Sequence, residues 1–449
     1  MSLPSYDQYK FCKADWLDAL PDHWKLVRIR NLFEIKKRIV GELGYDVIAI
    51  TQQGVKIKDL EATTGQFSMD YSKYQLVEIG DFAMNHMDLL TGYIDISPFR
   101  GVTSPDYRVF SSLDEAPVCN RYFLYLFQHC YRQKIFFAYG QGSSQLGRWR
   151  FPTDEFRNFY VPLPSLNEQN AIASFLDRET AKIDDLVAEQ ERLIALLKEK
   201  RQAVISHAVT KGLNPDLPMK DSGVEWLGEV PAHWSVVRCK HQLNGIEQGW
   251  SPQAEARVVA EGEWGVLKAG CVNRGIFDDL QHKALDHIPA ERVSLKVSTG
   301  DLLMSRASGS KELIGSVALV KDCRFNLIIS DKIFRLHLDR NSCEEQYFYW
   351  CFQSQNVRRQ IELAINGAEG LANNITKFAI GEITIALPEP NEQAGISRYL
   401  SGEVKRIGLL VSEAEKAVSL LRERRAALVS AAVAGKIDVR GLVDTEEAA

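Results

Sequence analysis

The residues of this chain that could carry chemistry do not form a familiar catalytic pattern. The sequence has no G-x-x-x-x-G-K-[ST] phosphate loop, no G-x-S-x-G nucleophile motif and no H-E-x-x-H zinc motif. An adenine methyltransferase would carry an Asn- or Asp-Pro-Pro-aromatic tetrapeptide, which is absent. A metal-dependent nuclease would need clustered carboxylates beside a lysine, and no such cluster stands out. The sequence therefore predicts a chain without catalytic residues and without a bound metal ion.

A repeated His-Trp pair is the feature that most invites a catalytic reading. His23-Trp24 and His233-Trp234 stand in the same local pattern, P-x-H-W-x-x-V-R. Recurrence of such a pair supports a structural role as well as a functional one. We interpret each pair as an aromatic anchor at the start of a module, with the histidine packed or capping beside the tryptophan.

Polar, glycine-rich turns offer a second kind of chemistry, the binding of nucleic acid. Arg and Lys bind phosphate groups, whereas Arg, Lys, Asn, Gln, Ser and Thr can bind the edges of bases. The segment 140–150, GQGSSQLGRWR, combines glycine with polar and basic residues, and comparable turns occur at 51–53, 268–274, 306–311 and 373–377. For any single turn, a solvated surface loop is the simpler interpretation. The candidate DNA-binding residues are Thr51, Gln52, Gln53, Ser143, Ser144, Gln145, Arg148, Arg150, Lys268, Asn273, Arg274, Arg306, Ser308, Ser310, Lys311, Asn373, Asn374 and Lys377.

The composition is that of an ordinary folded protein and does not reveal a function. The chain has 449 residues, of which 45% are hydrophobic and 25% charged, and its formal net charge is -5. This composition excludes whole-chain disorder, and any basic surface for nucleic acid must be local. No apolar run is long enough to span a membrane. The cysteines form no C-x-x-C pair and the N-terminal segment has no signal-peptide pattern, which predicts a reducing, cytoplasmic location.

A long internal repeat decides the architecture. Three segments recur in the same order, and each contains Trp, His, Pro or Gly at fixed places. Such matches indicate two copies of a domain-sized unit rather than a solenoid of small repeats. The matched pairs are WLDALPDHWKLVR (16–28) with WLGEVPAHWSVVR (226–238), GDFAM (80–84) with GDLLM (300–304), and LPSLNEQNAIASFL (163–176) with LPEPNEQAGISRYL (387–400).

Each copy begins with a mixed module, which we call module one (20–164) and module two (230–388). Short β-branched and aromatic runs between turn residues are typical of strands, and longer apolar runs are typical of helices. Each module is therefore predicted to be α+β. The predicted strands lie at 45–59, 92–97, 314–320 and 332–338, and the predicted helices lie at 123–137 and 347–365.

Each copy ends in a long helix with an apolar stripe. Apolar or small residues recur at spacings that alternate between four and three, which is the heptad pattern of a coiled coil. Ser165 and Glu168 predict a capping box at the start of the first helix, and Pro390 suits the first turn of the second. Gly212 and Gly435 are suitable stops. The heptad positions are Ile172, Leu176, Ile183, Leu186, Leu193, Leu197 and Val204, and Ile396, Leu400, Ile407, Leu410, Ala417, Leu421 and Leu428.

Because the two apolar stripes are near copies, mutual pairing of the helices is the economical arrangement. An antiparallel pair would place the modules at opposite ends of a rod; the alternative is that each helix packs only on its own module. The predicted fold class is α+β, with two tandem repeats, each an α+β domain followed by a long helix, and the two helices pairing as an antiparallel coiled coil. The predicted segments are 1–164 and 230–388 for the domains, 165–212 and 389–436 for the helices, 213–229 for the linker and 437–449 for the tail.

This organisation resembles the specificity subunit of type I restriction–modification systems. The resemblance rests on the two modules, each closed by L-P-x-x-N-E-Q and a heptad helix, on the paired P-x-H-W-x-x-V-R motif, and on the junction TKGLNPDLPMKDSGVEWLGEVPAHW. It covers nearly the whole chain. It implies that residues 1–164 and 230–388 are target-recognition domains, each of which reads one half of a bipartite DNA site. The two long helices would act as a spacer and as a docking platform for two methyltransferase subunits.

The resemblance also implies a non-catalytic chain that works through partners. S-adenosylmethionine, ATP and Mg are expected on partner subunits, with no cofactor in this chain. The implied partners are double-stranded DNA, two methyltransferase subunits and motor–nuclease subunits, without a membrane. The DNA-reading residues of the family occupy no transferable motif, so the candidate residues rest on turn chemistry alone. Two alternatives remain, namely a coiled-coil scaffold or adaptor that does not bind DNA and an enzyme with an unfamiliar motif.

Overall fold

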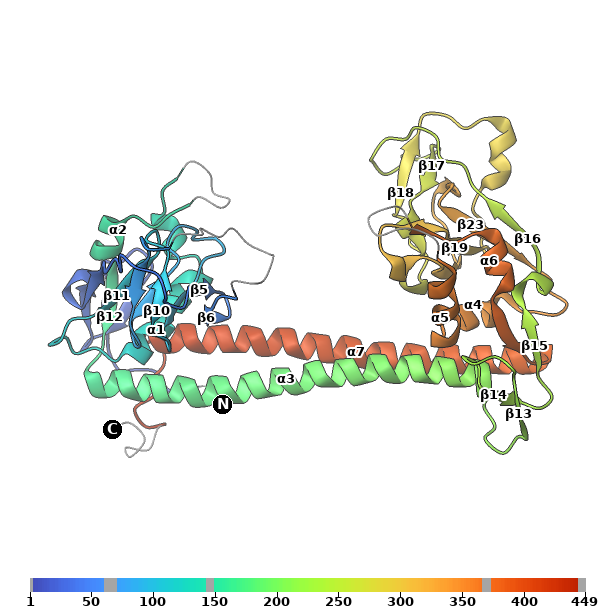
Figure 1. The fold of residues 1–449 in the computed structure, drawn as a ribbon. Helices are drawn as coiled ribbons and strands as arrows, with labels where there is room; N and C mark the ends of the chain where they lie inside the picture. Colours follow the sequence, from blue (N-terminus) through green and yellow to red (C-terminus); the bar gives the residue numbers. More distant parts are fainter. Residues whose placement is uncertain (1–2, 60–70, 143–148, 366–372, 443–449) are drawn as a thin grey trace. The chain divides into compact units, whose positions relative to one another are not determined.

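The chain folds into two compact units, and each contains one mixed module together with one end of each long helix (Figure 1). Unit 1 comprises residues 1–190 and 416–449, and unit 2 comprises residues 191–415. The structure, a computed structural model, describes residues 3–59, 71–142, 149–365 and 373–442.

Short antiparallel strands and one long amphipathic helix build module one and the segment before it. The strands are β1 (Tyr9–Phe11), β2 (Ala19–Pro21), β3 (Lys25–Arg28), β4 (Phe33–Lys36), β5 (Ile48–Thr51), β6 (Gly54–Ile57), β7 (Gln75–Val77), β8 (Phe82–Met84), β9 (Ile94–Ile96), β10 (Gly101–Thr103), β11 (Arg108–Ser112) and β12 (Tyr160–Leu163). The helices are α1 (Asn120–Arg132) and α2 (Thr153–Asn158), with 3₁₀ turns η1 (Ile29–Asn31) and η2 (Phe136–Tyr139). The largest described sheet has the strand order β4-β11-β8-β9.

Module two repeats this plan with a matching sheet of order β16-β23-β19-β21. Its strands, with those of the linker before it, are β13 (Met219–Asp221), β14 (Glu229–Pro231), β15 (Ser235–Arg238), β16 (Leu243–Gln248), β17 (Trp264–Leu267), β18 (His282–Leu285), β19 (Leu302–Ser305), β20 (Ala307–Ser308), β21 (Val317–Leu319), β22 (Asn326–Ile328), β23 (Ile333–Leu338), β24 (Asn373–Asn374) and β25 (Thr384–Leu387). Its helices are α4 (Glu345–Gln353), α5 (Gln355–Ala364) and α6 (Lys377–Glu382), with η3 (Cys239–His241), η4 (Ala269–Gly275), η5 (Ala290–Leu295) and η6 (Lys311–Leu313).

One predicted helix of module two is in fact two helices. The segment 347–365 predicts a single helix, whereas α4 ends before Ser354 and α5 begins after it. Ser354 is extended, and its Oγ accepts a hydrogen bond from the Val357 backbone N–H at 3.3 Å. A serine that caps a new helix cannot also continue the previous one, so the prediction of one continuous helix is wrong.

The main sheet of each module separates two apolar cores, because the side chains of a strand alternate between its faces. In unit 1, Phe82 and Met84 of β8 join the core that contains α1, whereas Ala83 joins the core with β5. In unit 2, Met304 of β19 joins the core that contains α4, whereas Leu303 joins the core with β17 and β22. Because equivalent residues of β8 and β19 face equivalent cores, the loops that follow the two strands begin in the same orientation relative to their sheets.

The two long helices are α3 (Leu166–Lys211) and α7 (Pro390–Val433), with 46 and 44 residues. Pro390 occupies the first helical position of α7, as predicted. Gly212 and Gly435 follow the helix ends with φ angles of +75° and +69°, which favour glycine. The predicted helix stops are therefore confirmed.

The helices pair antiparallel within each unit. In unit 2, Lys198 of α3 lies 3.9 Å from Glu415 of α7, whereas Ile205, further along α3, shares a core with Leu400, earlier in α7. In unit 1, residues near the start of α3 share a core with residues near the end of α7. The predicted fold class, α+β with two repeats and an antiparallel helix pair, is confirmed.

The apolar stripe of the long helices is only partly buried. The heptad pattern predicts Leu186, Leu193 and Leu410 as core positions, yet these side chains are 46%, 43% and 44% exposed. Val418, which lies outside the heptad register, is buried instead. A straight α-helix has 3.6 residues per turn, so its buried face drifts away from a strict heptad register. These three predictions are wrong, and leucines remain on the surface of both units.

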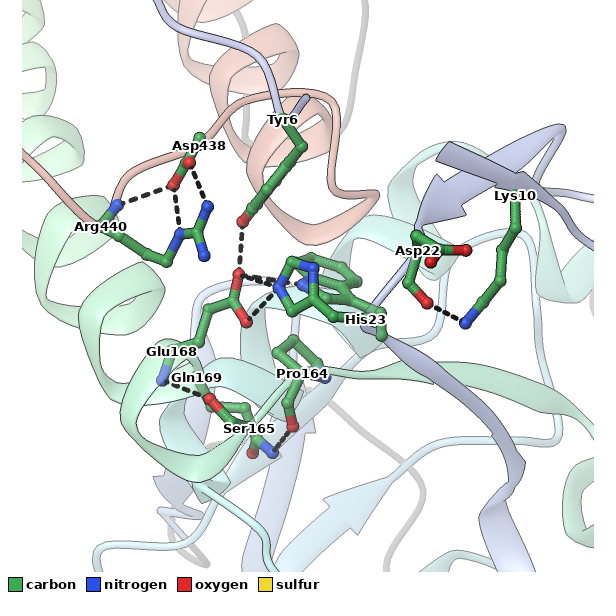
Figure 2. Close-up of polar contacts among 11 residues, drawn as sticks. Tyr6, Lys10, Asp22, His23, Pro164, Ser165, Glu168, Gln169, Asp438 and Arg440 are labelled. Atoms are coloured by element: carbon green, nitrogen blue, oxygen red, sulfur yellow. Dashed lines mark hydrogen bonds and ion pairs between the residues drawn. The ribbon is translucent and has the colours of Figure 1, made fainter. Parts of the chain in front are cut away.

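A buried carboxylate fixes module one to the start of α3 (Figure 2). Glu168 is buried, and its Oε1 accepts hydrogen bonds from the Tyr6 hydroxyl at 2.7 Å and from Trp24 Nε1 at 2.9 Å. His23 Nε2 lies 3.1 Å from the other carboxylate oxygen, which confirms the structural interpretation of the His-Trp pair. Ser165 Oγ accepts from the Glu168 backbone N–H at 3.4 Å. The Glu168 carboxylate, however, binds Trp24, so only half of the predicted capping box is formed.

Candidate nucleic-acid interface

The candidate interface is built on the loop that follows the inner strand β8 or β19 of each main sheet. We call this segment the central loop; it comprises residues 85–92 in module one and residues 305–311 in module two. Both central loops directly follow the repeated motif, GDFAM in module one and GDLLM in module two. The central loop of module two contains the predicted residues Arg306, Ser308, Ser310 and Lys311.

The same backbone hydrogen bond holds the central loop in both modules. In module one, the Phe151 backbone N–H donates to the His86 carbonyl at 2.8 Å. In module two, the Ile375 backbone N–H donates to the Arg306 carbonyl at 3.0 Å. Each central loop is therefore tied to the segment that leads into the last short helix of its module, and His86 and Arg306 occupy equivalent positions.

Strand pairing in module two brings together predicted residues that are far apart in the sequence. β20 pairs antiparallel with β24, so that Ala307 faces Asn374 and Ser308 faces Asn373. Asn373 is buried, and its Oδ1 has no hydrogen-bond partner among the described residues. Lys377 follows shortly afterwards as the first residue of α6. The two predicted turns, 306–311 and 373–377, thus form one surface.

Two cations of this surface share an aromatic ring. Arg306 Cζ lies 5.8 Å, and Lys377 Nζ 5.9 Å, from the centroid of the Phe334 ring. Both distances are within the range of a cation–π interaction. Arg306 Nη1 also donates a hydrogen bond to the Asp331 carbonyl at 3.3 Å. Positive charge is therefore held beside the polar side chains of β20 and β24.

In module one, the predicted residues Thr51, Gln52 and Gln53 form the turn of the β5–β6 hairpin. Thr51 Oγ1 donates to the Gly54 carbonyl at 2.9 Å, and Gly54 has a φ of +99°, which favours glycine. Gln52 Nε2 donates to the Thr91 carbonyl at 3.1 Å. Because Thr91 belongs to the central loop, this hydrogen bond places the hairpin turn against the loop.

Arg150 adjoins the same central loop. Its backbone N–H donates to the Gln141 carbonyl at 3.0 Å, and the carbonyl of Trp149 accepts a hydrogen bond from Leu89 in the central loop at 2.9 Å. Arg150 directly precedes Phe151, and Asn374 directly precedes Ile375. Because Phe151 and Ile375 make the same hydrogen bond to their central loops, Arg150 and Asn374 occupy equivalent positions. The predicted residues Ser143, Ser144, Gln145 and Arg148 lie outside the described residues.

Three predicted residues of module two lie apart from this surface. Lys268 precedes η4, and Asn273 and Arg274 lie within it. η4 packs against β19 and β21, and Arg274 has a φ of +57°. Among the described residues, none of the three shares a hydrogen bond or an ion pair with β20 or β24. The structure thus joins the turns at 306–311 and 373–377 but not the turn at 268–274.

Sequence reasoning misses His86, the residue of module one that is equivalent to Arg306. Burial, aided by the positive charges of Arg108 and Arg150, lowers the pKa of His86 to about 3. The imidazole is therefore neutral at neutral pH. Its buried Nδ1 has no hydrogen-bond partner within the described ranges. An alignment of GDFAMNH with GDLLMSR would have placed this histidine opposite the arginine.

A turn before β23 completes the surface in module two and was also missed. The Asp331 carbonyl accepts hydrogen bonds from Arg306 and, at 3.2 Å, from Gln248 Nε2. The Asp331 side chain accepts a hydrogen bond from Ser251 Oγ. These positions carry no glycine-rich or basic pattern, so nothing local in the sequence marks them.

A buried arginine occupies the position of Phe334 in module one. Arg108 pairs with Met84 across the sheet, as Phe334 pairs with Met304. The Arg108 side chain is buried, and its Nη2 donates to the Phe151 carbonyl at 2.9 Å. Burial lowers the pKa of Arg108 to about 10, which still leaves the guanidinium charged at neutral pH. At this strand position, module one thus carries a buried positive charge where module two has an aromatic ring.

Neither a metal-binding group nor a membrane-spanning helix occurs in the described ranges. There, no group of three or more His, Cys, Asp and Glu side chains could hold a metal ion. Nor does any helix within these ranges have the length and apolar character needed to cross a membrane.

Comparison with known proteins shows which family the first part of the chain resembles. Residues 21–194 match the family described as type I restriction modification DNA specificity domain. This part of the chain is therefore similar to the domains of that family. The resemblance to type I specificity subunits, inferred above from the repeat, is confirmed.

The curated relatives that the chain matches are specificity subunits. It is 27% identical over 243 residues to the type I restriction enzyme EcoKI specificity subunit of Escherichia coli (strain K12), which covers 53% of this chain and 49% of the relative. It is 27% identical over 197 residues to the EcoEI specificity subunit of Escherichia coli, covering 44% and 33%. It is 22% identical over 294 residues to the MjaVIII specificity subunit of Methanocaldococcus jannaschii, covering 64% of each. The matches thus span between 33% and 64% of the relatives' own lengths.

Two solved structures share the fold. One, described as the structural basis underlying complex assembly and conformational transition of the type I R-M system, matches with a TM-score of 0.64 at 17% identity, covering 92% of this chain and 98% of the other. The HsdS subunit from Thermoanaerobacter tengcongensis matches with a TM-score of 0.50 at 15% identity, covering 93% and 98%. At these identities the likeness concerns the fold, which agrees with two mixed modules and two long helices.

Proposed function

We propose that the chain is the DNA sequence-specificity subunit of a type I restriction–modification system, and that its two modules read the two halves of a bipartite target. The repeated central loop carries this proposal. In each module the loop is tied by the same backbone hydrogen bond, and in each it lies among polar and basic side chains. Two copies of one frame with different side chains fit two half-sites of different sequence.

The chemistry of each surface suits duplex DNA. In module two, Ser308 and Asn374 offer hydroxyl and amide groups for base edges, and Arg306 adds positive charge. In module one, Gln52 and Arg150 lie on either flank of the central loop and offer the same kinds of contact. We therefore assign target recognition to 1–164 and 230–388.

The long helices support the second part of the proposal, the docking of two methyltransferase subunits. Leu186 and Leu410 occupy equivalent positions in the two repeats, and their side chains are 46% and 44% exposed. Exposed apolar patches mark protein interfaces, and the same helices expose further leucines, Leu193 and Leu196 on α3 and Leu409 on α7. The repetition of such a leucine in each unit fits two copies of one partner. Motor–nuclease subunits would join this assembly.

In this proposal the chain supplies recognition and no catalysis. S-adenosylmethionine, ATP and Mg²⁺ would be bound by the partner subunits, which would also carry out base flipping and methylation. The assembly would work in the cytoplasm, where both DNA and these cofactors are present.

Exchange of one module tests the proposal. Residues 20–164 are replaced by the corresponding module of a related specificity subunit, and the methylated sites of cells that carry the complete system are mapped. We expect one half of the bipartite site to change and the other half to stay. The matched control replaces 230–388 and should change only the opposite half.

Two outcomes would reject the proposal. A change of both half-sites in either exchange would contradict independent reading by the modules. If the assembled complex showed no salt-dependent, sequence-specific binding to DNA, the chain would instead be a coiled-coil scaffold.

A further inference from the structure

Two cations of module two face one aromatic ring without a carboxylate that neutralises them. Arg306 Cζ and Lys377 Nζ lie 5.8 Å and 5.9 Å from the Phe334 ring centroid. Within the described ranges, neither side chain forms an ion pair with an Asp or Glu. The acidic residue next to Arg306 is Asp331, which offers its backbone carbonyl to the guanidinium while its carboxylate accepts from Ser251. The positive charge of the pair is therefore left for another group to neutralise.

The backbone ties together the two segments that carry these cations. The Ile375 N–H donates to the Arg306 carbonyl at 3.0 Å, and Lys377 follows two residues later. Thr376 caps α6, with its Oγ1 accepting from the Ala379 N–H at 3.1 Å, and this cap fixes the start of the helix that carries Lys377. Like charges held at such a site repel each other, and a bound anion would remove the repulsion.

We propose that Arg306 and Lys377 form a phosphate clamp, in which both side chains bind one phosphate group of the DNA backbone. The guanidinium provides a planar fork of donors that matches phosphate oxygens, and the ammonium adds a second positive charge. Phe334 is fully buried and forms a fixed platform for both. The inference rests on the proposed function and assigns the two cations to the backbone of the half-site. Base reading then belongs to neighbouring side chains such as Ser308 and Asn374.

The corresponding positions of module one carry no such pair. The residue equivalent to Arg306 is His86, and the residue equivalent to Lys377 is Thr153. The ring position is held by Arg108, whose Nη2 lies 3.4 Å from Thr153 Oγ1. A single buried guanidinium with a hydroxyl neighbour cannot enclose a phosphate as two surface cations can. The clamp is therefore assigned to module two.

The salt dependence of DNA binding tests the clamp. The full chain is assembled with its methyltransferase partners, and its affinity for a mixed-sequence duplex is measured over a range of NaCl concentrations. The variants are Arg306→Gln, Lys377→Met and the double variant, which remove the charge and keep an unbranched side chain. Lys283→Met is the matched control, because Lys283 is an exposed lysine on β18 of the same module. Thermal unfolding of each variant shows that it remains folded.

One phosphate contact contributes about 0.9 to the slope of log affinity against log salt concentration. If both cations bind one phosphate, the double variant should flatten the slope by about 0.9 in total, and each single variant should lose only part of that amount. The control should retain the full slope. Mapping of methylated sites should show the same half-site sequence in every variant, because phosphate contacts carry no base identity.

Three results would overturn the clamp while leaving the proposed function intact. A flattening of about 1.8 in the double variant would mean two separate phosphates. An unchanged slope would mean that no phosphate is bound. A relaxed base preference at one position of the half-site would assign Arg306 to a base edge. By contrast, if the unaltered assembly binds no DNA, the proposed function fails and the clamp fails with it.

Discussion

The two modules place positive charge at the same point of the same fold in opposite ways. In module two, the strand position beside the central loop holds Phe334, and the charges of Arg306 and Lys377 lie around its ring. In module one that position holds Arg108, which is 3% exposed, and His86 in the loop is neutral. The two repeats therefore share one backbone arrangement, whereas the side chains at equivalent positions determine which charges each surface carries. One fold can thus carry two different reading surfaces.

The contact between each module and the start of the long helix that follows it shows a second difference. Glu168 accepts hydrogen bonds from Tyr6 and Trp24 in unit 1. In unit 2, the equivalent Glu392 contacts His233 at 2.9 Å, and the buried Nε1 of Trp234 has no hydrogen-bond partner among the described residues. The same motif thus contributes more to the stability of unit 1 than to that of unit 2.

The largest effect should come from breaking this anchor. Glu168→Ala should lower the free energy of unfolding of unit 1 by about 2–4 kcal/mol, because the buried Trp24 N–H and the Tyr6 hydroxyl both lose their acceptor. Glu392→Ala should cost less than about 1 kcal/mol, because its side chain is 30% exposed and bonds a half-exposed histidine. Native-state hydrogen exchange, resolved by unit, measures both losses. Equal losses in the two units would show that the anchors are equivalent after all.

Acid should destabilise unit 1 through two histidines. Burial is the main cause that lowers the pKa of His86 to about 3 and that of His129 to about 4, from an ordinary 6.5. The unfolded chain takes up these protons below about pH 6.5, whereas the folded chain does so only near the lowered pKa values. Stability is therefore fully present above pH 6.5 and is lost as the pH falls towards 4 and then 3. At pH 5 the loss should be about 1–2 kcal/mol per histidine.

The comparison of His129→Gln with the unaltered chain checks this acid sensitivity. Urea unfolding of both proteins at pH 7 and at pH 5, followed by a probe in unit 1, gives the change in unfolding free energy. The variant should lose less stability between the two pH values, because glutamine does not titrate. The same loss in both proteins would assign the acid sensitivity to other groups.

The helix ends and the anchoring role of the His-Trp pair could be predicted because the sequence patterns that determine them are local. Pro390 at a helix start, Gly212 after a helix end and the recurrent His-Trp pair each act within a few residues, so their roles follow from local chemistry. The break at Ser354 was missed because the aromatic residues before it and the apolar residues Val357 and Ile361 after it both fit a helical spacing. The exposure of Leu410 was missed because a heptad pattern assumes that the buried face never drifts.

The candidate site was harder to predict because its parts meet through long-range pairing. Ser308 and Asn373 were each identified from turn chemistry, but only the pairing of β20 with β24 places them on one surface. His86 carries no glycine-rich or basic context, so it was found only through its equivalence to Arg306. Local patterns therefore identify which residue types could bind DNA, whereas the repeat aligned on the structure shows which positions correspond.

The smallest effect on stability should come from the exposed leucines of the long helices. Leu186→Gln and Leu410→Gln should each change the free energy of unfolding by less than about 0.5 kcal/mol, because these side chains are already nearly half exposed to solvent. Ile407→Val, which removes one methyl group from a fully buried side chain of α7, should cost about 0.5–1.5 kcal/mol. If each leucine docks one methyltransferase subunit, both glutamine variants should weaken assembly to a similar extent, as measured by titration in the analytical ultracentrifuge. Loss of binding in only one variant would mean that the two units, although built from one repeat, do not offer partners the same surface.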